Sequence, residues 1–462
     1  MLAPLTLHDV VTATRGRVVG RSPVGPFAGV GIDSRTLGAG EVFFAIQGPR
    51  FDGHDFLAQA RAAGAEAAVV HRDLADAPLP LVRVADTTRA LADLARHRRE
   101  QAAIPVVCIT GSAGKTTTKE MTAALLARRG AVLKTEGNLN NQYGLPLSLL
   151  RLAPAHRHAV LELGMSAAGE LRALSAIARP DVAVITLVAP VHLEFFASVD
   201  DIAAAKAEIL EGLRPGGAAV LNADDPRVRA AGERHPGKVV WFGRDRRCQV
   251  SAENWRGTVH GMRFDLRVDG RSVDVALPLP GPHFLTNFLA AAATAHVLGL
   301  SAEEIAEGAT GMKAARHRGE VLALGQGVTL LDDCYNSNPA AVEAAVAALD
   351  MAAQGRRVAF LGDMLELGPR GPELHRATAR AVAPRLRARV AVGAQAEHLL
   401  AGAREGGLPA EALHAFADSE QAAAAAPGLL RPGDAVLVKG SRGVRMEKVV
   451  DALAGHFGAL EA

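Results

Sequence analysis

Short apolar runs rich in β-branched residues alternate with longer segments of helical periodicity along almost the whole chain. Such alternation predicts βαβ units, in which parallel sheets are covered by helices. The run IPVVCIT is typical of a buried strand that leads directly into a glycine turn. The pattern predicts strands at 30–34, 41–47, 66–71, 81–85, 104–110, 158–163, 181–188, 218–222, 329–333, 357–362, 388–393 and 434–440. It predicts helices at 55–63, 87–100, 115–129, 142–152, 168–178, 200–213, 285–299 and 445–458.

Breaks in this rhythm divide the chain into three predicted domains. A strongly polar stretch from Arg98 to Pro105 reads as a linker, and a β-rich excursion interrupts the second part at 238–280. A length of 462 residues also favours about three domains. The predicted fold class is α/β. It comprises a smaller N-terminal α/β domain (1–100), a central domain with a mostly parallel sheet between helices (101–318), and a C-terminal Rossmann-like domain (319–462).

Composition narrows the function classes. A formal net charge of +2 argues against a nucleic-acid-binding surface. The three cysteines are isolated, so neither a disulfide framework nor a zinc site is indicated, and a reduced, cytoplasmic compartment is expected. The first residues lack a signal-peptide pattern, and no apolar run approaches 18 residues, so no membrane span is expected.

A glycine-rich turn joins the predicted strand at 104–110 to the helix that follows it. Glycines let backbone N–H groups approach phosphates, and a helix N-terminus adds positive potential. Lys115 can reach the β- and γ-phosphates of a nucleotide, and the Thr116 hydroxyl can bind Mg²⁺. The spacing is shorter than GxxxxGK[ST], so the alternative is a tight turn with a solvated lysine. The candidate nucleotide-binding residues are Gly111, Ser112, Ala113, Gly114, Lys115, Thr116 and Thr117.

This TGSAGKTT segment resembles the short phosphate loop of the Mur ligase family, which includes folylpolyglutamate synthetases. The resemblance extends over essentially the whole chain, with the motifs in family order. It implies a three-domain enzyme that uses ATP and Mg²⁺ to form an amide bond. It also implies that Lys115 is catalytic.

The resemblance assigns further metal-site residues to the central domain. Glu162, in LELG, matches the family's metal-binding glutamate, although a strand-end glutamate is ordinarily just solvated. His192 and Lys206, in VHLE and KAEI, match a histidine that serves a second Mg²⁺ and a lysine that becomes a carbamate. An isolated helical lysine is otherwise a surface charge. The implied Mg²⁺ ligands are Thr116, Glu162, His192 and carbamylated Lys206, and His192 and Lys206 are also expected to be catalytic.

Several polar segments match the family's nucleotide-binding motifs. Asn287, in GPHFLTN, matches an adenine-contacting asparagine, whereas Phe284 replaces the family's other asparagine. Arg318 is assigned to a phosphate-facing arginine, although three neighbouring basic residues leave the register open. In DDCYNSNP, the resemblance places Asp333 and Tyr335 beside the nucleotide.

Other segments match substrate-binding motifs. Taken alone, GNLNN is an asparagine-rich turn and NSNP is a helix N-cap. In the family, such segments face the muramoyl-peptide and the domain interface. DSR and FDGH match segments that hold a UDP group, and GDMLELG and KGSR, with His375 after the former, match C-terminal motifs. The candidate substrate-binding residues are Ser34, Arg35, His54, Asn138, Asn140, Asn141, Asn336, Asn338, Asp363, Lys439 and Arg442.

The motif set implies a particular reaction, which is addition of D-alanyl-D-alanine to a UDP-muramoyl-tripeptide through an acyl phosphate. The alternatives are a sister ligase that adds the third peptide residue, a folylpolyglutamate synthetase, and a nucleotide-binding regulator without ligase activity. The sister ligase's DNPR-type segment is absent and its DYAHxP-like segment is replaced by DDCYNSNP. The third residue of the tripeptide stays open between meso-diaminopimelate and L-lysine. Family analogy favours a monomer.

Overall fold

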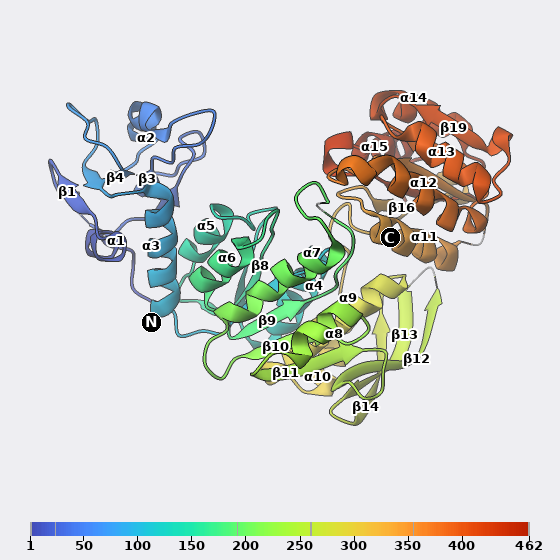
Figure 1. The fold of residues 1–462 in the computed structure, drawn as a ribbon, viewed down its shortest axis with the longest axis horizontal. Helices are drawn as coiled ribbons and strands as arrows, with labels where there is room; N and C mark the ends of the chain where they lie inside the picture. The colour runs from blue at the N-terminus through green and yellow to red at the C-terminus, as the bar shows by residue number, and fades with distance from the viewer. Residues whose placement is uncertain (1, 24, 192, 259–260, 354, 461–462) are drawn as a thin grey trace.

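The protein is described here from a computed structural model, which covers residues 2–23, 25–191, 193–258, 261–353 and 355–460. Within these ranges, three sheets of five, nine and six strands follow one another along the chain. Figure 1 shows them as successive lobes, coloured blue, green to yellow, and orange to red. The predicted α/β class with a mostly parallel central sheet is confirmed.

The N-terminal sheet has the order β1-β5-β4-β3-β2, with β1 antiparallel to β5 and the other pairs parallel. The sequence pattern did not predict α1 or β1. The capping box between Thr6 and Asp9, in which each residue bonds the other's backbone or side chain, explains where α1 begins. The elements are α1 (Leu7–Thr14), β1 (Arg17–Val19), β2 (Gly29–Gly31), β3 (Glu41–Phe44), α2 (Leu57–Ala62), β4 (Ala67–Val70), β5 (Leu81–Arg83) and α3 (Thr87–Gln101).

The central sheet has the order β14-β13-β12-β11-β10-β9-β6-β8-β7. Its strands from β7 to β12 are parallel, and β12, β13 and β14 continue it as antiparallel hairpins. The elements are β6 (Val106–Thr110), α4 (Lys115–Leu126), β7 (Ala131–Lys134), α5 (Gly144–Leu150), β8 (His156–Glu162), α6 (Glu170–Ala178), β9 (Val182–Ile185), α7 (Val199–Ala207), β10 (Ala218–Asn222), α8 (Pro226–Glu233), β11 (Lys238–Gly243), β12 (Val250–Thr258), β13 (Gly261–Val268), β14 (Arg271–Leu277), α9 (Pro282–Val297) and α10 (Ala302–Ala309).

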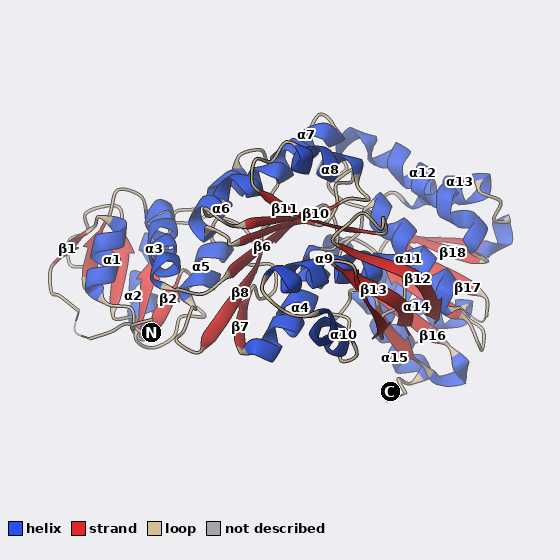
Figure 2. Ribbon diagram, turned by 90° about the horizontal axis from the view of Figure 1, so that it is seen from below, coloured by secondary structure: helices blue, strands red, loops and turns tan. Residues whose placement is uncertain are grey.

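Both faces of the central sheet are covered, as Figure 2 shows. Val107 and Ile109 of β6 face the core formed with α4 and α9, whereas Val106 and Cys108 face the core formed with α5, α6 and α7. This alternation is the strand period of two acting on an apolar run. It fixes β6, and therefore the turn after it, in the middle of the molecule.

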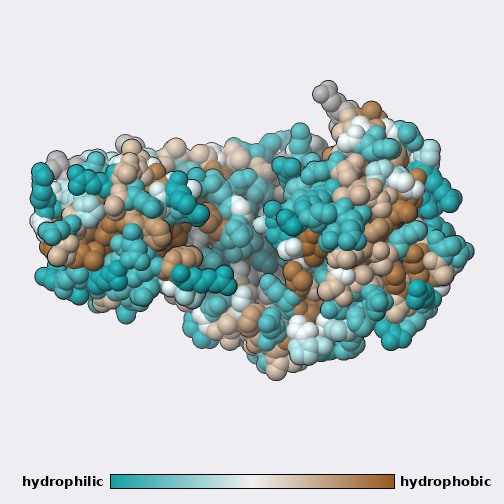
Figure 3. Space-filling view, turned by 90° about the horizontal axis from the view of Figure 1, so that it is seen from above, coloured by the Kyte–Doolittle hydropathy of each residue, from teal (hydrophilic) through white to brown (hydrophobic). Residues whose placement is uncertain are grey.

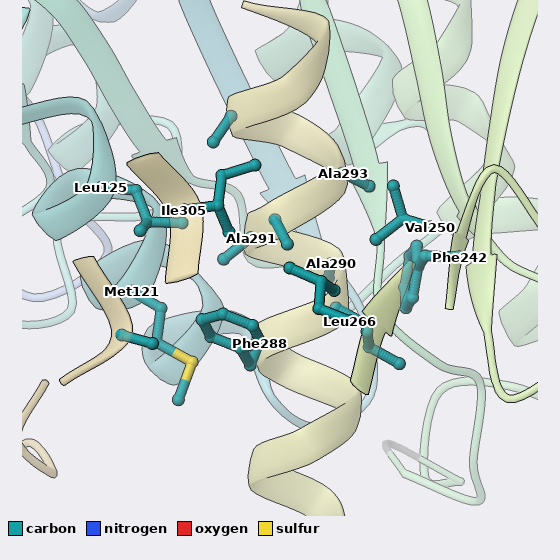
Figure 4. Close-up of a cluster of buried hydrophobic side chains, with 14 of the residues drawn as sticks. Met121, Leu125, Phe242, Val250, Leu266, Phe288, Ala290, Ala291, Ala293 and Ile305 are labelled. Atoms are coloured by element: carbon teal, nitrogen blue, oxygen red, sulfur yellow. The ribbon is translucent and has the colours of Figure 1, made fainter. Parts of the chain in front are cut away.

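Helix α9 is buried on nearly every side, and its many alanines allow neighbouring elements to pack closely around it. In Figure 4, Met121 and Leu125 of α4 lie on one side of α9, and Phe242 and Val250 lie on the other. Small side chains let a helix approach its neighbours closely, so a chain with only 4% aromatic residues still fills this core. The fully buried alanines of α9 are Ala290, Ala291, Ala292, Ala293 and Ala295.

The C-terminal sheet has the order β15-β16-β20-β17-β18-β19, and all its pairs except β15–β16 are parallel. The carboxyl ends of β16, β17 and β20 therefore lie at one edge. The elements are β15 (Glu320–Ala323), β16 (Thr329–Asp333), α11 (Pro339–Ala352), β17 (Arg357–Gly362), α12 (Gly371–Val382), β18 (Ala388–Val392), α13 (Ala396–Glu405), β19 (Leu413–Phe416), α14 (Ser419–Leu429), β20 (Ala435–Lys439) and α15 (Glu447–Phe457).

The predicted helix at 87–100 and the predicted linker at 98–105 overlap, and the helix prediction is the correct one there, because α3 continues to Gln101. Arg99 is only 1% exposed and donates hydrogen bonds to the Ala178 carbonyl (2.9 Å) and to the Asp181 carboxylate (2.7 Å). A charged side chain is buried at a domain junction only when it is paired in this way. The polar stretch therefore fastens α3 to the central domain.

The face seen in Figure 3 is mostly hydrophilic, with smaller groups of hydrophobic side chains on both ends of the molecule. Within the part of the chain that the structure describes, no helix combines the length and the apolar composition needed to cross a bilayer.

Candidate active site

A cavity of about 920 Å³ lies where the carboxyl ends of the central strands face those of the C-terminal strands. Crevices at the carboxyl ends of parallel strands are the usual ligand sites of α/β folds. Most of the predicted site residues line it. These are Ser112, Ala113, Gly114, Lys115, Thr116, Thr117, Asn138, Asn140, Asn141, Glu162, Lys206, Asn287, Arg318, Asp333, Tyr335, Asn336, Asn338, Lys439 and Arg442.

The turn between β6 and α4 is packed so closely that two of its positions require glycine. Gly114 has a φ of +82°, and a Cβ there would lie 2.2 Å from Oδ1 of Asn287. A Cβ on Gly111 would lie 1.9 Å from Oγ1 of Thr186. Ser112 closes the turn, because its hydroxyl accepts a hydrogen bond from the Ala189 N–H (2.9 Å). The turn is thus a rigid cradle at a helix N-terminus, suited to phosphate.

Glu162, at the carboxyl end of β8, lies beside this cradle. Its carboxylate accepts hydrogen bonds from the Thr116 hydroxyl (2.7 Å) and the Asn140 amide (3.0 Å), and the residue is only 4% exposed. A buried carboxylate held by neutral donors, with a hydroxyl in contact, offers the hard oxygen ligands that Mg²⁺ prefers. The residues present therefore fit the magnesium site that the sequence predicts.

Two lysines face the same region of the cavity. Lys115 donates to the Gly111 carbonyl (2.8 Å), and desolvation, with the Arg318 guanidinium, lowers its pKa against the opposing effect of Glu162. Lys206, on α7, is 2% exposed, and burial, aided by the charge of Lys115, lowers its pKa well below the usual range. For Lys206, whose pKa is lowered the more strongly, burial favours the neutral amine over the ammonium form.

The C-terminal domain contributes a second group of charges. Lys439, 2% exposed, donates hydrogen bonds to the Asp333 carboxylate (2.6 Å) and to the Asn336 carbonyl (2.9 Å). The guanidinium of Arg318 lies over the Tyr335 ring at 4.1 Å. These contacts order the loop after β16 beside the segment that joins the two domains.

Comparisons with known proteins agree with this geometry. Three family models match in chain order: the Mur ligase family catalytic domain (26–99), the Mur ligase middle domain (109–295) and the Mur ligase glutamate ligase domain (317–442). The chain belongs to the Mur ligase family. Among its curated relatives is the UDP-N-acetylmuramoyl-tripeptide–D-alanyl-D-alanine ligase of Escherichia coli K12, 39% identical over 91% of this chain and 92% of the relative. The enzyme of that name from Bacillus subtilis 168 is 32% identical over 92% and 93%.

Solved structures of the family share the whole architecture. A MurF crystal structure from Acinetobacter baumannii has a TM-score of 0.91, with 35% identity, 98% of this chain and 99% of that chain covered. A MurF ligase from Thermotoga maritima in complex with ADP has a TM-score of 0.82, with 30% identity and coverages of 93% and 97%. These matches confirm the sequence-based prediction that the chain is a Mur ligase with a three-domain α/β architecture.

Some predicted residues do not line the cavity of this Mur ligase. Ser34, Arg35 and His54 belong to the N-terminal lobe, where Ser34 donates to Gln59 (3.2 Å), Arg35 pairs with Asp33 (2.7 Å), and buried His54 pairs with Asp52. Gly111 does not line the cavity directly, although it shapes the turn. His192 lies outside the described residues.

Asp363 is also absent from the cavity lining, and the structure explains why. Both of its carboxylate oxygens accept backbone N–H groups, from Ala394 (2.9 Å) and Gln395 (3.0 Å). His375 is likewise structural, because its Nε2 accepts the Met364 N–H (2.8 Å) and its Nδ1 donates to the Gly371 carbonyl (2.6 Å). Asp363 thus holds the GDMLELG loop against the turn that follows β18, and its role as a substrate contact stays a prediction.

The cavity-lining side chains that received no role from the sequence include those of Arg244, Trp255 and Glu366. Arg244 follows β11, Trp255 lies on β12, and Glu366 lies in the GDMLELG loop. The β-rich excursion carries no motif that distinguishes Arg244 or Trp255 from surface residues. Glu366 lies within the GDMLELG motif, between Leu365 and Leu367. An acidic side chain between two leucines was the feature of the sequence that could have marked it as a site residue.

Proposed function

We propose that the protein is an ATP-dependent ligase that joins D-alanyl-D-alanine to a UDP-N-acetylmuramoyl-tripeptide and releases ADP and phosphate. The observation that supports it most directly is the single cavity that holds the phosphate loop and Glu162 on one side and the Asp333–Lys439 loop on the other. The curated relatives with 32–39% identity over most of the chain carry this activity in their names.

The proposed roles follow from the contacts. Backbone N–H groups of 111–117 would bind the nucleotide phosphates, and the Lys115 ammonium would face the β- and γ-phosphates. Asn287, held against Gly114, would border the base, and Arg318 would add positive charge. Thr116 and Glu162 would hold Mg²⁺, with His192 and carbamylated Lys206 as further ligands. The metal would offset the negative charge that accumulates during phosphoryl transfer.

The reaction requires an activated acid. A substrate carboxylate oxygen attacks the γ-phosphorus, the bond to the ADP oxygen breaks, and an acyl phosphate forms. The amine of the second substrate then attacks the acyl carbon, phosphate leaves, and the nitrogen loses a proton. Lys115 and Arg318 are positioned to stabilise charge during both displacements. The cavity lies between the central and C-terminal parts of the chain, so bound ATP and substrates would fill it and reduce the access of water to the acyl phosphate.

The substrates are assigned to opposite sides of the cavity. Asn138, Asn140 and Asn141 would hold the muramoyl-peptide beside the phosphate loop, and Ser34, Arg35 and His54 would hold the UDP end. Asn336, Asn338 and Arg442 would face the incoming dipeptide. Because ATP and UDP-linked substrates are used inside the cell, we expect the enzyme to act in the cytoplasm. We also expect it to act as a monomer.

The deciding experiment is a product assay with purified protein. ATP, Mg²⁺ and UDP-muramoyl-tripeptide should yield ADP and a UDP-linked pentapeptide only when D-alanyl-D-alanine is added. The tripeptides that carry meso-diaminopimelate and L-lysine should be tested separately, because the sequence leaves the third residue open between them. Omission of Mg²⁺ should abolish turnover.

The same assay tests the alternatives. Turnover only with UDP-muramoyl-dipeptide and a single diamino acid would identify the sister ligase and overturn the proposal. Turnover with folates but with no UDP-linked substrate would overturn it as well. A nucleotide-binding regulator would bind ATP but release no ADP with any substrate pair.

A further inference from the structure

Glu366 occupies a strained position at the tip of the loop that follows β17. Its φ of +63° lies in the left-handed region, which costs a side-chain-bearing residue about 1 kcal/mol. The residue is exposed, and it lines the cavity. Its carboxylate also raises the pKa of Lys115, so it lies within electrostatic reach of the phosphate loop. Strain of this kind persists only where the surroundings enforce it.

The surroundings of this loop do enforce it. The Met364 N–H donates to His375 and the Leu365 N–H donates to the Ser441 hydroxyl (2.9 Å). On the other side, Gly368 packs against the backbone of Glu194 in the central domain, where a Cβ would lie 3.2 Å from the Cα of Glu194. The loop therefore presents Glu366 to the cavity in one defined position.

Arg442 lies on the neighbouring loop, which follows β20. Because β17 and β20 pair in parallel, their carboxyl ends lie side by side, and the Leu365–Ser441 hydrogen bond joins the two loops. The Arg442 side chain is 59% exposed, lines the cavity and approaches the Tyr335 ring at 5.7 Å. Its guanidinium also contacts the carboxylate of the partly buried Glu447 (3.2 Å).

We propose that Glu366 binds the ammonium group and Arg442 binds the carboxylate of the incoming D-alanyl-D-alanine. This inference rests on the proposed function, since it assigns the contacts of that amine substrate. A dipeptide is a zwitterion, and an extended one spans about 7 Å. Loops that follow adjacent strands lie about 5 Å apart at their bases, so side chains from both can reach its two ends.

The pairing also explains why the charges lie where they do. Glu366, whose charge raises the pKa of Lys115, would bring the amine nitrogen to the side of the cavity where the acyl phosphate forms. Arg442, on the loop that follows β20, would bind the carboxylate end with a charge-assisted hydrogen bond. Lys439 cannot take this role without breaking its buried contact with Asp333. Both ligand-binding residues thus come from one domain, which would deliver the dipeptide as a unit.

The first test separates amine binding from activation of the acid. With ATP, Mg²⁺ and UDP-muramoyl-tripeptide, hydroxylamine should trap the acyl phosphate as a hydroxamate without any dipeptide. Glu366→Gln should form hydroxamate at the wild-type rate, while its KM for D-alanyl-D-alanine rises at least 10-fold and its KM for ATP stays unchanged. Glu373→Gln, an exposed carboxylate on α12, should leave all three quantities unchanged.

The second test addresses the carboxylate end. Wild-type enzyme should prefer D-alanyl-D-alanine over D-alanyl-D-alanine amide in kcat/KM by at least 10-fold. Arg442→Ala should lose that preference, and Glu366→Gln should retain it although both substrates bind more weakly. Each variant should have the melting temperature of the wild type. If Glu366→Gln unfolds at a lower temperature, Glu366→Asp, which keeps a carboxylate, should recover part of the affinity for the dipeptide.

The outcomes are distinguishable. An unchanged KM for the dipeptide in Glu366→Gln, or a hydroxamate rate that falls as much as the overall rate, would show that Glu366 acts on phosphoryl transfer and overturn the inference. A retained acid preference in Arg442→Ala would overturn the carboxylate assignment. Failure of the wild type to form hydroxamate from a UDP-muramoyl-tripeptide would instead reject the proposed function.

Discussion

Lys439 and Asp333, 106 residues apart in the chain, form an ion pair of 2.6 Å at the carboxyl ends of the adjacent strands β20 and β16. The lysine is 2% exposed and also donates to the Asn336 carbonyl. This contact joins the KGSR and DDCYNSNP motifs and orders the C-terminal edge of the cavity. Its role is therefore structural as well as electrostatic.

Removal of this ion pair should lower stability. We expect Lys439→Met to lower the free energy of unfolding by about 3 kcal/mol, because the change leaves a half-buried carboxylate without its cation. The measurement is thermal unfolding followed by circular dichroism. Arg370→Met is the matched control: it removes an exposed pair with Glu373 of 3.0 Å, which should contribute less than about 1 kcal/mol. Equal melting temperatures for the two variants would contradict this reading.

A second prediction concerns the phosphate loop. Lys115→Ala should reduce kcat by at least about 10²-fold, since it removes a cation preorganised against the transferring phosphoryl group. Its melting temperature should change little, because the hydrogen bond that its ammonium makes among the described residues is to the backbone of Gly111. Lys134→Ala, on the exposed end of β7, should keep wild-type activity. Near-normal turnover in Lys115→Ala would remove the basis for placing the phosphates there.

Local patterns allowed most of the fold to be predicted, and the failures have physical causes. The predicted strands at 218–222, 329–333 and 357–362 coincide with β10, β16 and β17, because each is an apolar run bounded by polar residues or glycine. β7 was missed because the segment AVLK is short and only Leu133 is buried. Arg99 was read as part of a linker because its partners, the Ala178 carbonyl and Asp181, lie about 80 residues away.

The candidate site likewise has features that the sequence predicts and features that it does not. The turn after β6 and the strand-end position of Glu162 follow from neighbouring residues, so they could be predicted from sequence. The Asp333–Lys439 pair and the left-handed conformation of Glu366 could not. The first depends on sheet order, and the second depends on hydrogen bonds to Met364 and Leu365 that distant residues supply. Glutamate has no local preference for a positive φ.

His283 should make stability depend on pH. Burial, together with the charge of Lys439 and against that of Asp333, lowers its pKa from 6.5 to about 4, and its Nδ1 has no hydrogen-bond partner among the described residues. Between pH 6.5 and 4 the unfolded chain therefore binds more protons than the folded chain. Stability is complete above pH 6.5 and falls as the pH decreases through this window.

The measurement compares melting temperatures at pH 7 and pH 5 in the wild type and in His283→Asn. Acidification should cost the wild type more, by at most about 2 kcal/mol at pH 5, because the asparagine does not titrate. The remaining histidines are common to both proteins, so their contributions cancel in the comparison. Identical pH dependence in the two proteins would show that the pKa of His283 is the same in the folded and unfolded states, and would contradict the prediction.

The last prediction concerns Lys206, whose surroundings suit a neutral amine better than an ammonium ion. It is 2% exposed on α7, it has no hydrogen bond or ion pair within the described ranges, and Lys115 adds a repelling charge. A neutral amine can attack CO₂: an N–C bond forms, one C=O bond of CO₂ becomes C–O⁻, and the nitrogen loses a proton, so the amine becomes an anionic oxygen donor. Such a donor would suit a site whose other oxygens come from Thr116 and Glu162.

Lys206→Ala should therefore lose at least about 10²-fold in kcat, the scale of a missing preorganised charge. Acetate or formate, added at high concentration, should restore part of the activity by entering the vacated space as a carboxylate. Lys115→Ala is the matched control, because it lacks a cation and no added acid should rescue it. Wild-type enzyme depleted of CO₂ should also slow and recover with bicarbonate. Full activity of Lys206→Ala without any added acid would contradict this prediction. It would show that Lys206 only helps α7 to pack, and that the Mg²⁺ ligands are other residues.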